Sequence, residues 1–125
     1  MSAPPHNKGL KRIVNAFFFS MQGFSACFRT EEAFRQEVYL AIIMVPLGLW
    51  LGGDPTEKII LAGSVILVLI VELLNTAVER AIDRISFEKH ELSKEAKDMG
   101  SAAVLLSLVL CGITWALILG AKLLG

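Results

Sequence analysis

Two carboxylates, Glu72 and Glu79, lie in or directly after a long apolar segment that begins at Ile59. Ionisable side chains at membrane depth are costly and are usually retained for function. At about 100° per residue, they fall within roughly 80° of Asn75 and Asp83 on one helix face. A stripe of carboxylate and amide oxygens that leaves a membrane at one end suggests chemistry on a lipid headgroup or passage of an ion.

The depth of each side chain along this stripe predicts its role. Glu72 is the deepest, about 10 Å of helix from Glu79, and is either a general base or a structural glutamate bonded to a neighbouring helix. Glu79 is closer to water and suits Mg²⁺, which prefers one or two carboxylates with phosphate oxygens and water. Asn75 could donate to a phosphoryl oxygen or orient a carboxylate. Asp83 either continues the stripe or forms a salt bridge to an arginine.

The composition indicates that these side chains are positioned by membrane helices. The chain has 125 residues, 54% of them hydrophobic, and a mean hydropathy of +0.61, which is too apolar for an ordinary soluble domain. Three apolar segments are present, and the first, 38–51, crosses only a thin bilayer core with its polar ends at the interface. We predict an all-α membrane protein, one membrane domain over 8–125, with spans at about 36–52, 59–79 and 100–123.

The N-terminal region has a different pattern. Residues 1–7 (MSAPPHN) are expected to be disordered, and an amphipathic helix is predicted over about 8–30. Phe, Leu and Ile on one side with Lys and Arg nearby are typical of a helix lying on a membrane surface. The apolar stripe consists of Leu10, Ile13, Val14, Phe17, Phe18, Met21, Phe24 and Phe28.

Lysine and arginine are unevenly distributed along the chain, although its net charge is zero. They concentrate before the first span and in the loop 80–98, whereas loop 52–58 has only Lys58 and the C-terminal end only Lys122. The positive-inside rule then places the N-terminus and the second loop in the cytoplasm. The wet end of the carboxylate stripe would face the compartment where nucleotides are found.

Several common functional patterns are absent from the sequence. It contains no glycine-rich phosphate loop and no kinase catalytic-loop motif, so any nucleotide phosphate would be bound in another way. Cys27 and Cys111 form neither a metal-ligand pair nor a redox motif, and we expect two free thiols packed as small hydrophobes.

Three sequence elements carry a family resemblance: EAFRQE (32–37), VELLNTAVERAIDRIS (71–86) and HELSKEAKDMGSAAV (90–104). In this order, between three spans, they resemble the bacterial integral-membrane diacylglycerol kinases over about residues 9–120. A related family of undecaprenol kinases shares the E-x-L-N-[ST]-A-[VI]-E element. The basic start, AFRQE and the HELS segment are more similar to the diacylglycerol branch.

This resemblance implies a homotrimer in the bacterial inner membrane, with Mg-ATP bound at composite sites between subunits. By motif position, Glu72 would be the catalytic base on the lipid hydroxyl, and Glu31 and Glu79 would hold magnesium. Asn75 and Asp83 would support them. The implied nucleotide contacts are Arg12, Phe19, Glu31, Glu79, Glu88, Lys89, His90, Lys97 and Asp98. The implied lipid contacts are Arg12, Ala16, Phe19, Ser20, Ala33, Phe34, Arg35, Gln36, Glu37, Trp50, Glu72, Ser101 and Trp115.

Three positions depart from the family pattern. Phe19 stands where tyrosine is usual, and Ser25 stands where arginine is common. Arg80 follows Glu79 where a small residue is usual. Its guanidinium would add positive charge at a phosphate, or would neutralise Asp83 or Glu79.

Three alternatives remain open. The first is an undecaprenol kinase, the second a small cation-conducting membrane protein, and the third a non-catalytic membrane-interaction subunit. A through-going ion path requires polar residues in the outer half of the second span, but 59–71 offers only Gly63 and Ser64. The non-catalytic alternative leaves the alignment of Glu72, Asn75 and Glu79 unexplained.

Overall fold

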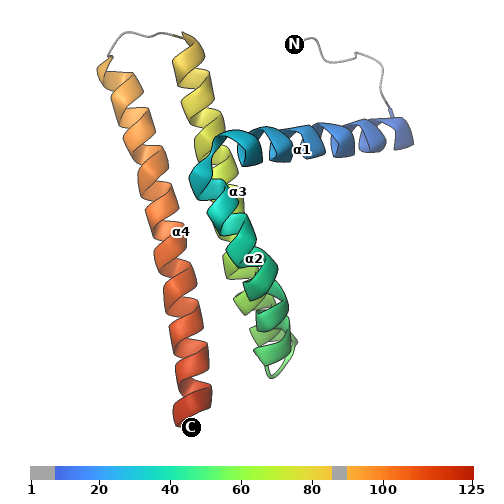
Figure 1. Ribbon diagram of the computed structural model, residues 1–125, viewed down its shortest axis with the longest axis vertical. Helices are drawn as coiled ribbons and strands as arrows, with labels where there is room; N and C mark the ends of the chain where they lie inside the picture. Colours follow the sequence, from blue (N-terminus) through green and yellow to red (C-terminus); the bar gives the residue numbers. More distant parts are fainter. Residues whose placement is uncertain (1–7, 86–89) are drawn as a thin grey trace.

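The computed structural model describes residues 8–85 and 90–125, and within these ranges the chain is helical, with no strands. Three helices lie side by side, and the N-terminal helix runs across their direction and meets the bundle at two of them (Figure 1). This confirms the all-α prediction. The residues expected to be disordered, 1–7, lie outside the described ranges. The helices are α1 (Leu10–Thr30), α2 (Glu32–Leu51), α3 (Pro55–Ile85) and α4 (Glu91–Leu124).

The central helix of the bundle is α3, which packs against both α2 and α4. Its buried residues Leu61 and Val65 form a core cluster with Ala41 of α2 and Trp115 of α4. The indole N–H of Trp115 donates to the carbonyl of Leu61 at 3.1 Å, so the polar atom of this buried ring is satisfied. Gly48 allows the close approach of α2, because a Cβ there would lie 2.9 Å from the Cβ of Leu61.

Helices α2, α3 and α4 are each long and apolar enough to cross a membrane. Helices α3 and α4 have 31 and 34 residues, about 46 and 51 Å of helix, against a hydrocarbon core of roughly 30 Å. Both helices rise past the level of α1, at the end where α3 and α4 are joined (Figure 1). The prediction that α1 lies on the membrane surface would place this excess length on the aqueous side of α1.

The corner between α1 and α2 is a single residue, Glu31, in an extended conformation with φ −114° and ψ 110°. The guanidinium of Arg35 closes this corner, since its Nη1 donates to the carbonyl of Phe28 at 2.8 Å and to that of Arg29 at 3.0 Å. These carbonyls have no partner inside α1 because the helix ends there. The ring of Phe34, fully buried, then anchors the first turn of α2.

The opposite end of the bundle is fixed by a turn and one ion pair. Asp54 caps α3, since its Oδ1 accepts from the N–H of Glu57 at 2.8 Å, and Pro55 takes the first helical position. The Oε1 of Glu57 accepts from the N–H of Gly53 and lies 2.8 Å from the Nζ of Lys122. The turn at Asp54-Pro55 is therefore tied to the end of α4.

Candidate active site

The candidate site is an acidic cluster where the α1–α2 corner meets the middle of α3. Glu72 is buried, with 8% of its surface exposed. The exposed face of α3 near it carries apolar side chains such as Leu74 and Val78. Its carboxyl group lies within hydrogen-bond reach of that of Glu37 on α2. Glu31 at the corner and Glu79 on α3 are close enough to act electrostatically on Glu72. The α1–α2 corner, α2 and α3 therefore bring four carboxylates into one neighbourhood.

Glu37 approaches Glu72 from α2, so carboxyl groups of two different helices are neighbours. The Oε1 atom of Glu37 is buried and has no hydrogen-bond partner within residues 8–85 and 90–125. Glu37, predicted only as a lipid contact, is therefore also the direct neighbour of the predicted base.

Asn75 lies one turn closer to water than Glu72, against helix α4. Its Oδ1 atom is buried and has no hydrogen-bond partner in the described part of the chain. It rests on Gly100, where an added Cβ would collide with that oxygen. The missing side chain at Gly100 is what allows the carboxamide to fit between α3 and α4. A buried amide oxygen without a partner is available to a donor that the single chain does not supply.

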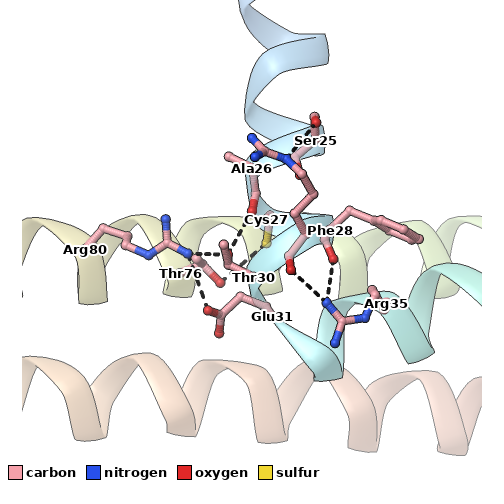
Figure 2. A network of polar contacts seen from close by, with 10 residues as sticks. Ser25, Ala26, Cys27, Phe28, Thr30, Glu31, Arg35, Thr76 and Arg80 are labelled. Carbon is pink, nitrogen blue, oxygen red and sulfur yellow. Dashed lines mark hydrogen bonds and ion pairs between the residues drawn. The ribbon is translucent and has the colours of Figure 1, made fainter.

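A polar network joins the corner to α3 (Figure 2). The Cys27 thiol donates to the Thr76 hydroxyl at 3.6 Å, and burial raises the pKa of this thiol. The guanidinium of Arg80 donates to the hydroxyl of Thr30 and lies 3.4 Å from the Oε2 of Glu31. Arg80 therefore contacts the corner, whereas the sequence had suggested Asp83 or Glu79 on its own helix.

The C-terminal end of α3 and the N-terminal end of α4 carry residues expected at the nucleotide. Lys97 is paired with Asp83 at 2.7 Å, and Lys94 with Asp98 at 2.8 Å. The Asp83 partner is thus a lysine of α4 where an arginine had been considered. His90 caps α4, because its Nδ1 accepts from the N–H of Leu92 at 3.1 Å. Two further predicted nucleotide contacts, Glu88 and Lys89, lie outside the described residues.

The surface helix places its predicted ligands away from the bundle. Arg12, Ala16, Phe19 and Ser20 are exposed on α1, and the Ser20 hydroxyl donates back to the carbonyl of Ala16 at 2.9 Å. The N-terminal part of α1 projects outward from the other helices (Figure 1). Over the described residues, α1 contacts α2 and α3 but not α4. One chain therefore does not bring Arg12 or Phe19 together with Lys97 and Asp98.

The remaining predicted lipid contacts are divided between surface and core. Trp50 is 78% exposed near the end of α2, and Ser101, Ala33 and Gln36 are also exposed. Phe34 and Trp115 are packed inside the bundle, and Arg35 binds the end of α1. The latter three side chains have clear structural functions, and their lipid contacts stay predictions.

The described ranges contain no group of three or more His, Cys, Asp or Glu side chains that could hold a metal ion alone. Both cysteines are free thiols, as expected. A hard cation such as Mg²⁺ is commonly held by one or two carboxylates completed by phosphate oxygens and water. Glu31 and Glu79, whose charges both act on Glu72, have the carboxylate chemistry that this mode uses.

The fold and this site together define a multi-pass α-helical membrane protein with an acidic cluster between its helices. Its sequence matches the model of the family described as Prokaryotic diacylglycerol kinase over residues 18–119. The chain belongs to this family, and the resemblance read from its three motifs is confirmed.

Curated relatives agree with this family over nearly their whole length. The diacylglycerol kinase of Pseudomonas aeruginosa is 50% identical over 111 residues, which cover 89% of this chain and 90% of the relative. The diacylglycerol kinase of Haemophilus influenzae is 48% identical over 107 residues, or 86% and 91% of the two chains. The diacylglycerol kinase of Escherichia coli K12 is 46% identical over 111 residues, or 89% and 91%. The chain is thus an enzyme of a kinase family.

The contact between Asn75 and Gly100 generates a prediction. Gly100→Ala should displace the carboxamide and lower turnover by at least about tenfold, since small misplacements in a site are costly to catalysis. Gly112→Ala is the matched control, because it lies on the same helix and its Cβ would meet nothing within 4 Å. Both rates would be measured on purified protein in lipid micelles. Native turnover in Gly100→Ala would show that the position of Asn75 does not matter.

Proposed function

We propose that this chain transfers the γ-phosphoryl group of ATP to the free hydroxyl of 1,2-diacylglycerol, with Glu72 as general base. The hydroxyl oxygen forms a bond to the γ-phosphorus, the bond to the bridging oxygen breaks, and ADP leaves. The hydroxyl proton passes to the carboxylate of Glu72, and phosphatidate is the product. The supporting observation is that Glu72 is buried, whereas the other carboxylates of the cluster, Glu31, Glu37 and Glu79, are more exposed.

The position of Glu72 suits an acceptor that arrives from the membrane. It lies on α3 below the level at which the polar network ties α3 to the corner, so a lipid hydroxyl approaches from the apolar side. A general base must be within hydrogen-bond reach of the proton that it takes. Glu37 of α2 is the carboxyl neighbour of Glu72 on the adjacent helix.

Phosphoryl transfer needs little covalent help from the protein, so positioning and charge carry most of the catalysis. Magnesium, held by Glu31 and Glu79 with phosphate oxygens, would neutralise charge on the transferring group. The two carboxylates come from different elements, the corner and α3, so their separation depends on the corner geometry. Asn75, between the base and Glu79 along the helix, would donate to a phosphoryl oxygen through its amide group.

The nucleotide would lie against the aqueous ends of α3 and α4, where Lys97 and Asp98 are exposed enough to change partners. Its other proposed contacts, Arg12 and Phe19, are on α1, which does not reach α4 in one chain. A second copy that places its α1 beside this α4 would complete the site. This supports an oligomer with composite sites, for which the family resemblance implies three copies. A monomer found by analytical ultracentrifugation of active protein in detergent would contradict it.

The proposed orientation has the N-terminus and the 86–90 region in the cytoplasm of the inner membrane, and the 52–54 turn and C-terminus outside. The lysine and arginine asymmetry supports it. Labelling of a cysteine introduced at position 91 from outside intact cells would contradict this orientation.

The alternatives find less support. Undecaprenol kinases share the E-x-L-N element, but the relatives reported above are named diacylglycerol kinase. A cation path would have to pass Leu61, Val65 and Val68, which are buried apolar residues between Glu72 and the outer end of α3. The hydroxyl of Ser64 in this region is already bonded to the carbonyl of Leu61 at 2.9 Å.

The lipid preference tests the proposed function directly. Purified protein in mixed micelles, given radiolabelled ATP with diacylglycerol or undecaprenol at equal mole fraction, should phosphorylate diacylglycerol faster. The matched background is the same micelle without an acceptor lipid. Faster labelling of undecaprenol would move the assignment to the undecaprenol kinases, and no labelling of either lipid would overturn the kinase proposal for this chain.

A further inference from the structure

Arg80 of α3 is a cation that contacts the candidate site from outside the α1–α2 corner. Its guanidinium lies 3.4 Å from the Oε2 of Glu31, and the two side chains are 49% and 34% exposed. Figure 2 shows Arg80 reaching from α3 to the corner between α1 and α2. Glu31 is the carboxylate that the proposed function assigns to magnesium, so a cation of the protein now occupies that position.

The neighbouring threonine fixes the direction of the guanidinium. Thr30 accepts a hydrogen bond from the Nη2 of Arg80, and its own hydroxyl donates to the carbonyl of Ala26 at 2.8 Å. The Thr30 hydroxyl therefore has a defined orientation, with its lone pairs available to Arg80. Because Glu31 is the only residue between two helices, its backbone is held as well. Two adjacent residues at the corner, Thr30 and Glu31, therefore both contact the guanidinium of Arg80.

The strength of this ion pair is low enough for exchange. The separation of 3.4 Å is long for a charge-assisted hydrogen bond, and the pair is partly open to solvent. Exposed pairs of this kind add little to stability. A divalent ion with phosphate ligands can therefore displace the guanidinium from Glu31, whereas the guanidinium itself cannot lose its charge.

We infer that Arg80 competes with the metal ion for Glu31 and, once displaced, binds a phosphate oxygen of the nucleotide. This inference rests on the proposed function, in which Glu31 is a magnesium ligand. In the resting protein the guanidinium of Arg80 faces the carboxylate of Glu31, which is one of the negative charges that act on Glu72. When the metal and nucleotide arrive together, one ion pair is exchanged for two, Glu31 with metal and Arg80 with phosphate. Arg80 is thus a positioning residue that makes binding of the metal and of the nucleotide mutually dependent.

A purely structural role makes a different prediction. If Arg80 only tethered α3 to the corner, its removal would lower thermal stability and weaken both ligands or neither. Competition instead requires two opposite changes, tighter binding of the metal ion alone and weaker binding of the nucleotide in the presence of metal.

The experiment measures binding, without turnover, on the full chain in detergent micelles. Mn²⁺ is titrated in the absence of nucleotide, with free Mn²⁺ followed by electron paramagnetic resonance. A β,γ-methylene analogue of ATP is titrated by calorimetry at saturating Mg²⁺. The variants are Arg80→Ala, Arg80→Lys, Glu31→Gln and the control Arg84→Ala, which removes an exposed arginine one turn further along the same helix.

The expected result is a pair of opposite shifts. Arg80→Ala should bind Mn²⁺ about two- to fivefold more tightly, as suits a partly exposed ion pair. It should bind the nucleotide analogue about three- to tenfold more weakly, because a charged donor to phosphate is lost. Arg80→Lys should lie between these values, and Arg84→Ala should match the wild type in Mn²⁺ affinity. Glu31→Gln should weaken Mn²⁺ binding, because it removes the charge of the proposed metal ligand.

Two contrary outcomes are distinguishable. If Glu31→Gln weakens Mn²⁺ binding but Arg80→Ala changes neither titration, the inference about Arg80 is wrong and the proposed metal role of Glu31 stands. If Glu31→Gln binds Mn²⁺ like the wild type, or neither protein binds it, the metal assignment fails and the inference fails with it. Arg80→Lys guards against a misfolded Arg80→Ala, since it retains the charge and most of the packing.

Discussion

A carboxyl group held in an apolar helix bundle is destabilising unless other polar groups accompany it, and Glu72 is such a group. The arrangement around it follows from this cost. Glu37 on α2 supplies a hydrogen-bonding partner at the same depth, and Glu31 and Glu79 lie on the side toward water. A single helix could not place these carboxylates on both sides of Glu72. The burial of Glu72 therefore constrains how α1 and α2 are positioned relative to α3.

The corner between α1 and α2 determines how the surface helix is oriented relative to the first span. It is one residue long, so the angle between the surface helix and the first span depends on the side chains that brace it. Arg35 holds the end of α1, Arg80 reaches it from α3, and the contact of Cys27 with Thr76 seats α1 on α3. The rings of Phe24 and Phe34, 6.2 Å apart, add apolar contact across the bend. The position of the Glu31 carboxylate therefore depends on packing contacts that lie some distance from the proposed site of phosphoryl transfer.

Much of this site could be predicted from the sequence, because its central stripe lies on one helix. The helical period alone places Glu72, Asn75 and Glu79 on one face, and apolar runs predict the spans. Contacts between helices could not be obtained in this way, because they depend on how two helices are aligned in depth. Arg80 illustrates the difference, since the nearest charges in sequence, Glu79 and Asp83, are not its partners, whereas Glu31 is. The contact of Gly100 with Asn75 and the cap by His90 likewise require the packed structure.

The central claim is that Glu72 takes the proton of the lipid hydroxyl, and the variant Glu72→Gln tests it most directly. Binding of Mg-ATP and of lipid would be measured by calorimetry, in parallel with turnover. Because the amide keeps the shape of the side chain but is not a base, both affinities should stay near native. Turnover should fall by about 10²–10⁴-fold, the range typical of a lost general base. Near-native turnover in Glu72→Gln would show that Glu72 is structural and would contradict the proposed mechanism.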